Sequence, residues 1–152
     1  MQEKLQKLAE LVSEVADIQH SIALLGWDQQ VFMPSGGAEE RGYMMGTLGK
    51  IAHEKFISDE MGKLLDELKE YLPELDQDSE NYRIISVTAM DYEKTICVPS
   101  AFVTKRALVV SLAQQAWMKA RSKSDFSIFL PHLEKVVDLS QQYVSFFPAG
   151  DH

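Results

Sequence analysis

Apolar residues recur every three or four positions along most of this chain, and that spacing limits its possible folds more than any other feature. Side chains spaced in this way lie on one face of an α-helix. The first series begins at Leu5, and its further members share one helix face: Leu8, Leu11, Val12, Val15, Ile18, Ile22 and Leu25. No strand-length segment alternates cleanly between apolar and polar residues. The sequence therefore predicts an all-α protein.

Prolines, glycines and capping residues divide this pattern into segments. After the first helix, the pattern predicts a second helix over residues 38–56. A third helix is expected over 58–72, with Ser58 as its N-cap and Pro73 at its end, because serine accepts a hydrogen bond from the first turn. A fourth helix is predicted over 79–96.

Two further helices complete the prediction. Pro99 is expected in the first turn of the fifth, where a missing N–H costs nothing. Asp125 is the expected cap of the sixth, with a break or kink near Pro131, which would lie too far inside for a first-turn proline. The connections are short, which favours antiparallel neighbours. The sequence thus predicts one helical domain over 1–152, an antiparallel bundle of about six helices.

The aromatic residues are expected in the core, since they stand at helical spacing beside other apolar residues. Trp27 lies roughly 140° around the first helix from Ile22, so this helix is expected to lie between neighbours at its C-terminal end. The aromatic residues with this prediction are Trp27, Phe102, Trp117, Phe126 and Phe129.

Charge and cysteine content exclude several classes of function. The chain of 152 residues carries a formal net charge of −8 and no dense lysine and arginine cluster, which argues against a nucleic-acid or membrane surface. No apolar run approaches the ~18 residues of a membrane-spanning helix, and the N-terminus lacks a signal-peptide pattern. A single cysteine, Cys97, suits a reducing compartment, so a cytoplasmic location is expected.

The sequence predicts no metal site. Its histidines are His20, His53, His132 and His152, and no two of them are four residues apart. The segment HEKFI, residues 53–57, begins like the zinc motif HExxH but ends in isoleucine, so a surface His–Glu pair is the preferred interpretation. No cofactor is expected in this chain.

The sequence evidence for a nucleophilic residue or for an anion-binding site is also weak. Cys97 has no histidine partner in the sequence, so a buried or half-buried structural thiol is expected. The Ser35-Gly36-Gly37 segment could present backbone N–H groups to an anion at the start of the second helix, or form a tight interhelical turn. Turn chemistry favours the second alternative. The sequence therefore predicts no catalytic residue.

Four segments resemble one known family. The segment LGWDQQVFMPSGGAEER, residues 25–41, resembles the N-terminal signature of the carboxypeptidase Taq family of zinc metallocarboxypeptidases. Three further matches follow in the family's order: IAHEKF, DYEKTICVP and, from residue 113 to 137, AQQAWMKARSKSDFSIFLPHLEKVV. The residues that match the signature are Trp27, Asp28, Gln29, Met33, Pro34, Gly36, Gly37 and Arg41.

The resemblance implies the N-terminal helical part of a zincin-type enzyme about three times longer. In such an enzyme an HExxH helix and a downstream glutamate hold zinc, which polarises the C-terminal peptide carbonyl, and neither motif occurs in this sequence. The N-terminal helices would form a wall or lid of the substrate channel. Asp28, Gln29 and Arg41 would orient that wall, and Gly36-Gly37 would let two helices approach closely.

Two hypotheses follow. In the first, the chain is the N-terminal part of such an enzyme, inactive alone, and peptide substrates bind only in the full-length enzyme. In the second, it is a stand-alone helical interaction or dimerisation module. Both predict self-association through exposed apolar helix faces, because the first and fifth helices are apolar on more than one face.

Overall fold

The computed structural model describes residues 1–34 and 36–147, and every regular element in these ranges is a helix. The prediction of an all-α fold with six helices is confirmed. Two 3₁₀ turns, η1 (Leu72–Glu74) and η2 (Phe126–Ile128), interrupt the chain. The helices are α1 (Gln2–Val31), α2 (Ala38–Phe56), α3 (Asp59–Lys69), α4 (Glu80–Thr95), α5 (Ser100–Lys123) and α6 (Leu130–Val144).

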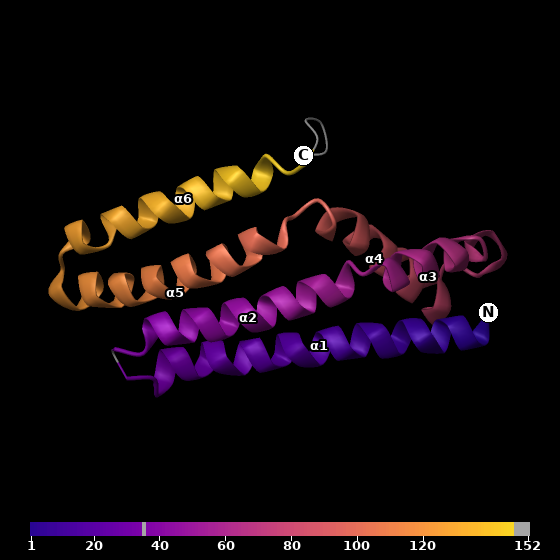
Figure 1. The fold of residues 1–152 in the computed structure, drawn as a ribbon, viewed down its shortest axis with the longest axis horizontal. Coiled ribbons are helices and arrows are strands. Elements are labelled where there is room, and N and C mark those ends of the chain that lie inside the picture. Colours follow the sequence, from indigo (N-terminus) through magenta and orange to yellow (C-terminus); the bar gives the residue numbers. More distant parts are fainter. Residues whose placement is uncertain (35, 148–152) are drawn as a thin grey trace.

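Four long helices lie side by side in the order α1, α2, α5, α6, and each runs antiparallel to its neighbour (Figure 1). The most extensive helix contact joins α2 to α5. Helices α3 and α4 lie at the end of this row that holds the N-terminus. We call the opposite end, where α1 turns into α2 and α5 turns into α6, the turn end. The bundle is thus an elongated layer with a cap at one end.

The larger core lies at the capped end, where the N-terminal half of α1 packs on α3 and α4. Its apolar side chains are withdrawn from water, which is the main favourable term in folding. Ion pairs support this packing: Lys4 with Glu67 at 3.0 Å and Lys7 with Glu60 at 3.1 Å. The buried members of this core are Leu8, Leu11, Met61, Leu64, Leu65, Leu68, Ile85 and Ala89.

A smaller core joins α5 to α6. Phe102 is only 6% exposed, and its ring meets the Phe146 ring edge to face, with ring centroids 5.0 Å apart. The Tyr143 ring stacks on the Phe102 ring, with the ring centroids 6.0 Å apart. Val98 and Leu139 complete the buried group. The prediction that Phe102 lies in a core is therefore confirmed.

The prediction that Ser58 caps α3 is confirmed, because its hydroxyl accepts a hydrogen bond from the first turn of that helix. Ser79, the predicted start of the fourth helix, caps α4 in the same way. Pro99 precedes the first residue of α5 as its N-cap, one position earlier than predicted.

The region around Pro131 corrects the sequence prediction. The Asp125 carboxylate caps the 3₁₀ turn η2, and α6 begins only at Leu130. Pro131 is therefore a first-turn proline after all, and the predicted break lies just before it, where the missing N–H needs no partner. Helix α3 also ends earlier than predicted, at Lys69, and Pro73 lies in η1.

The prediction for the C-terminal end of α1 is wrong. We expected this end to be covered on both sides, yet Trp27 is 57% exposed and Phe32 is 70% exposed. Trp117 and Phe126 are also exposed, contrary to their predicted place in the core. The reason is the single-layer arrangement: within the row α1 lies at the edge and packs only on α2, so the remaining apolar side chains at its C-terminal end face outward.

Among the residues that the structure describes, no helix by itself is long and apolar enough to span a bilayer. Only α4 and α5 taken together meet those criteria, as a pair bent by 84°.

Candidate functional site

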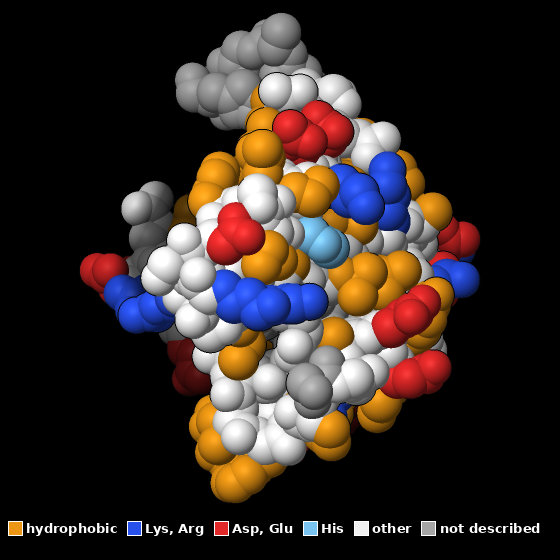
Figure 2. Space-filling model, turned by 90° about the vertical axis from the view of Figure 1, so that its left-hand side faces the viewer, with side chains coloured by type: hydrophobic (Ala, Val, Ile, Leu, Met, Phe, Trp, Pro, Cys, Tyr) orange, Lys and Arg blue, Asp and Glu red, His pale blue; other side chains and the backbone are white. Residues whose placement is uncertain are grey.

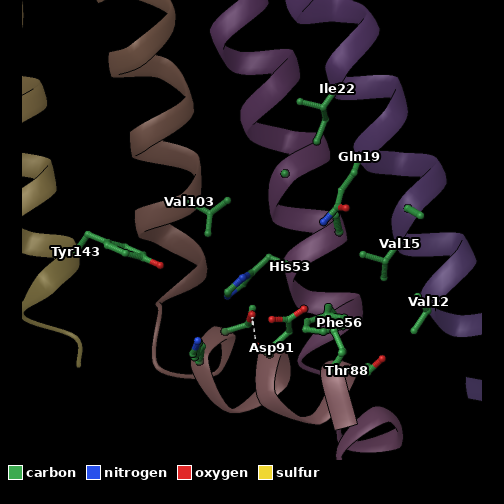
Figure 3. A pocket seen from close by; sticks show the side chains of 16 residues that line it. Val12, Val15, Gln19, Ile22, His53, Phe56, Thr88, Asp91, Val103 and Tyr143 are labelled. Carbon is green, nitrogen blue, oxygen red and sulfur yellow. Dashed lines mark hydrogen bonds between the residues drawn. The ribbon is translucent and has the colours of Figure 1, made fainter. Parts of the chain in front are cut away.

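A groove of about 670 Å³ lies where α1, α2, α4 and α5 meet, and we call it the His53 groove. Figure 3 shows His53 reaching into it from α2, between Val103 of α5 and Asp91 of α4. Tyr143 extends towards it from α6. Side chains from five helices therefore converge on one concave surface, which is the usual form of a ligand site.

His53 is the most unusual residue of this groove. It is only 8% exposed, and its Nε2 atom is buried without any hydrogen-bond partner. Buried polar atoms are nearly always hydrogen-bonded, since leaving one unpaired costs about 1–3 kcal/mol. The prediction of a surface His53–Glu54 pair is therefore wrong for His53, although Glu54 is exposed. Position 53 faces α4 and α5, which the helix pattern of α2 alone did not reveal.

The walls of the groove combine apolar and polar side chains. Thr88 is buried, whereas Gln19, Asp91 and Lys94 are exposed at the edge. The edge thus offers a carboxylate and an ammonium group together with neutral donors and acceptors. The apolar wall residues are Val12, Val15, Ala16, Ile22, Ala52, Phe56, Val87 and Val103.

The groove does not have the ligands of a metal site. Among the described residues, no three His, Cys, Asp or Glu side chains lie close enough to hold a metal ion. His20, His53 and His132 belong to three different helices, α1, α2 and α6. Residue 57, where HExxH would need its second histidine, is isoleucine. These residues do not fit the zinc ion that the resemblance implies.

Cys97 also differs from its prediction. We expected a buried or half-buried thiol, but the side chain is exposed just after α4. Its Sγ atom lies 3.3 Å from the carbonyl oxygen of Glu93, to which it donates a hydrogen bond. The sequence did not reveal this exposure, because a short interhelical segment has no periodicity that indicates a buried side.

The signature segment forms a second polar cluster, at the turn end. Arg41 of α2 pairs with Asp28 of α1 at 2.5 Å and also donates a hydrogen bond to the backbone carbonyl of Leu25. The arginine side chain is largely buried, so the two contacts attach the start of α2 to the last turns of α1. Charge-assisted hydrogen bonds of this kind are stronger than neutral ones.

Gln29 connects the same region to α5. This glutamine is buried, and its amide nitrogen lies 3.0 Å from the Ser111 hydroxyl. The Ser111 hydroxyl in turn donates to the carbonyl oxygen of Ala38 at 2.8 Å. One buried chain of hydrogen bonds thus joins α1, α5 and α2. These contacts support a structural role for the signature.

The remaining signature residues form the turn itself. Trp27 packs edge to face on Phe32 at the surface, while the Pro34 carbonyl accepts a hydrogen bond from Gly37 N–H. Met33 lies against Gly37, where an added Cβ would come within 3.1 Å of Met33 Cγ. Ser35, part of the alternative anion site, lies outside the described residues.

The expectation that Gly36 and Gly37 bring two helices close together is wrong. A Cβ on Gly36 would have no atom within 4 Å, and the atoms near Gly37 belong to the turn. The close approach occurs at Gly42 and Gly46, where α2 crosses α5. Their four-residue spacing, in the segment GYMMG, places both glycines on one face of α2 and matches the small-residue pattern of close helix pairs.

Comparison with known proteins identifies relatives over most of the chain. The family model described as carboxypeptidase Taq (M32) metallopeptidase matches residues 7–152. Carboxypeptidase 1 of Bacillus subtilis is 27% identical over 143 residues, which are 94% of this chain and 28% of that protein. Thermostable carboxypeptidase 1 of Pyrococcus furiosus is 32% identical over 127 residues, or 82% of this chain and 24% of that protein.

The fold agrees with these matches. The crystal structure of BsuCP superimposes with a TM-score of 0.89 and 26% identity, covering 99% of this chain and 30% of that one. The chain therefore spans less than a third of the length of the relatives it matches.

Proposed function

Because the chain belongs to the carboxypeptidase Taq (M32) metallopeptidase family, we propose that it forms the N-terminal helical part of a zinc-dependent metallocarboxypeptidase. In this proposal the enzyme removes C-terminal residues from peptides, and these helices form a wall or lid of its substrate channel. The observation that carries the proposal is the match of nearly all of this chain to less than a third of the BsuCP structure. A cytoplasmic location belongs to the same proposal, supported by the single cysteine.

The geometry supports a positioning role without chemistry of its own. The hydrogen bonds of Arg41, Gln29 and Ser111 make α1, α2 and α5 one rigid unit, which a channel wall requires. Hydrolysis in this family would require zinc ligands that the described residues do not bring together. We therefore propose that the chain alone does not cleave peptides.

We expect no release of C-terminal residues from blocked dipeptides when the purified chain is incubated with zinc. A chimaera tests the proposal directly: residues 7–152 replace the matching region of Bacillus subtilis carboxypeptidase 1. We expect this chimaera to release C-terminal amino acids, measured by mass spectrometry, and to lose the activity when a chelator removes its metal. The Bacillus remainder without any N-terminal part is the control, and it should be at least tenfold less active.

Two results would contradict the proposal. One is chelator-sensitive release of C-terminal residues by the chain alone. The other is a chimaera that folds, as judged by circular dichroism, but is no more active than the remainder alone.

A second candidate function, a self-associating interaction module, is supported by the surface at the turn end. Figure 2 shows this end of the molecule, where hydrophobic side chains are spread among the charged ones. Leu24 and Phe32 of the α1 region are 68% and 70% exposed, and Phe126 at the start of η2 is 59% exposed. Large exposed apolar side chains mark a contact surface in many soluble proteins.

Sedimentation velocity is expected to show a concentration-dependent shift from monomer to dimer for the purified chain. The double substitution Leu24→Gln and Phe32→Gln should weaken this association at least tenfold, because it removes two large apolar contacts at the turn end. Val87→Gln on α4 is the matched control: Val87 is also exposed, but it lies away from the turn end. A monomer at every concentration, together with weak binding of a hydrophobic dye, would contradict self-association.

A further inference from the structure

Helices α5 and α6 each carry a row of apolar side chains on one face. Successive members of a row are seven residues apart, which keeps them on the same side of a helix. Val103, at one end, is half-buried, and the other members are 41–51% exposed. Single exposed apolar residues are ordinary in soluble proteins, whereas contiguous ones mark contact surfaces. The row on α5 is Val103, Val110 and Trp117, and the row on α6 is Leu130, Val137 and Val144.

Both rows lie on the side of the molecule that holds the His53 groove. Helix α6 runs antiparallel to α5 (Figure 1), and Figure 3 shows Val103 and Tyr143, one from each helix, extending towards that groove. The opposite side of this helix pair carries another groove, which Lys105 and Lys135 help to line. Val137 follows Lys135 by two positions, or roughly 200° around α6, so its row lies away from the lysines. The two rows therefore form one surface, which we call the α5–α6 face.

Helix α5 is strongly basic in an acidic chain. The chain has a formal net charge of −8, yet residues 100–123 contain five basic residues and no acidic one. Two of the five, Arg106 and Arg121, belong to the α5–α6 face, because Arg106 is three residues after Val103 and Arg121 is four after Trp117. The five basic residues are Lys105, Arg106, Lys119, Arg121 and Lys123.

The two arginines of the α5–α6 face have no acidic partner among the described residues. Arg121 Cζ lies 5.4 Å from the centroid of the Trp117 ring, a cation–π contact that leaves its N–H groups available. Within the described ranges no ion pair joins Arg106 or Arg121 to a carboxylate, whereas Arg41 pairs with Asp28. The face thus combines apolar rows with guanidinium groups that can still accept a carboxylate partner.

We infer that the α5–α6 face docks an acidic amphipathic helix from the part of the enzyme that lies outside this chain. The inference rests on the proposed function and adds to it the surface through which the N-terminal part is attached. In this arrangement the apolar side chains of the docked helix pack along the two rows, and its carboxylates pair with Arg106 and Arg121.

The relatives indicate where such a helix would come from. The chain matches the BsuCP structure with a TM-score of 0.89 but covers 30% of it, so the larger part of that protein lies outside the match. A surface of partly exposed valines, leucine and tryptophan is stabilised when the rest of a protein covers it, because burial removes apolar area from water. Two adjacent helices also present a groove into which the ridge of a third helix can pack.

The charges favour this occupant over a second copy of the chain. Two copies joined by their α5–α6 faces would bring Arg106 and Arg121 of one copy towards the same arginines of the other. Like charges brought together out of water are costly, and the polar residues within the rows, Gln114 and Ser140, are uncharged. A helix with glutamate or aspartate beside its apolar residues complements both the rows and the arginines.

The first test is a nuclear magnetic resonance titration of the isotopically labelled chain with a designed helical peptide. The peptide consists of three repeats of Leu-Ala-Ala-Leu-Glu-Ala-Glu with blocked ends, and a second peptide has lysine in place of glutamate. We expect saturable shifts along α5 and α6 with the glutamate peptide and about tenfold weaker binding of the lysine peptide. This preference would run against the net charge of −8, so it would report the local arginines.

Three variants assign the binding to the α5–α6 face. Val110→Gln combined with Val137→Gln should weaken binding about tenfold, because both side chains lie at the middle of the rows. Both are partly exposed, so the urea midpoint of the chain should stay unchanged. Arg106→Gln combined with Arg121→Gln should abolish the preference for glutamate over lysine. Ile51→Gln is the matched control: Ile51 is exposed but lies roughly 200° around α2 from His53, and binding should be unchanged.

The second test compares the chain with the chimaera by hydroxyl-radical footprinting. Trp117 should be oxidised about fivefold more slowly in the chimaera than in the chain alone, because the docked helix covers it. Met44 is the internal comparison. It is exposed two residues after Gly42, on the side of α2 away from α5, and should react equally in both proteins.

Four results would overturn the inference. They are the absence of saturable shifts, equal binding of the two peptides, unchanged binding by the Val110 and Val137 double variant, and equal oxidation of Trp117 in the chain and the chimaera. Protection of Trp117 that grows with the concentration of the chain alone would also overturn it and assign the face to a second copy. An active chimaera with an accessible Trp117 keeps the proposed function and rejects the docked helix, whereas an inactive chimaera with a protected Trp117 does the reverse.

Discussion

Replacing Gly42 with valine is expected to lower the free energy of unfolding by about 2–3 kcal/mol, because it forces α2 away from α5. A Cβ at this position would lie 2.9 Å from Leu108 Cδ1, 3.2 Å from Leu108 Cα and 3.3 Å from Ser111 Cβ. The Leu108 methyl could rotate away, but its backbone and the hydrogen-bonded Ser111 cannot. Urea denaturation followed by circular dichroism would measure the change.

Gly49→Ala is the matched control in the same helix. Its new Cβ would meet only Val103 Cγ1, at an ordinary 3.4 Å. Alanine is the better helix former by up to about 1 kcal/mol, so this substitution should be neutral or stabilising. Equal and small effects at both positions would show that α2 and α5 are not packed as closely as described.

Phe102→Ala is expected to cost about 3 kcal/mol and to loosen α6 before the rest of the molecule. Phe102 is the centre of the small core that holds α6 on α5, and removal of a buried phenylalanine ring usually costs 3–5 kcal/mol. The lower part of that range applies because this core is small and can partly collapse. Urea denaturation gives the total loss, and amide hydrogen exchange over 130–144 reports the local opening.

Phe126→Ala provides the comparison for this experiment. Phe126 is 59% exposed, so its removal should change stability by less than about 1 kcal/mol. Faster exchange in α6 is expected only for Phe102→Ala. If both substitutions cost the same, or if exchange in α6 is unchanged, the Phe102 cluster does not hold α6.

Local signals predicted the helices well. Three-and-four spacing predicted the helices, and the Ser58 cap and the break near Pro131 were also predicted, although Asp125 caps η2 and not the sixth helix. Such signals depend on nearby hydrogen bonds, so they can be interpreted without the tertiary structure. The family resemblance was equally visible, because four motifs lie in order along the chain.

The individual site residues were predicted less well. The predicted burial of His53 and Cys97 was wrong. His53 was expected at the surface and is buried, whereas Cys97 was expected to be at least half-buried and is exposed. Trp27 and Trp117 were expected in a core and lie outside it, while Gly42 and Gly46 were overlooked as contact points. Except for Cys97, which lies between two helices, each error concerns which neighbour covers a helix face.

The helical fold, the ends of the helices to within a few residues and the family of this chain can all be inferred from its sequence. The single row of four helices, the glycine contacts between α2 and α5 and the buried, unpaired His53 Nε2 become apparent only in the folded chain. The difference arises from the distance along the chain over which each kind of interaction acts. Capping and periodicity act over one to two turns, whereas burial depends on contacts between residues up to 82 positions apart, such as Gln29 with Ser111.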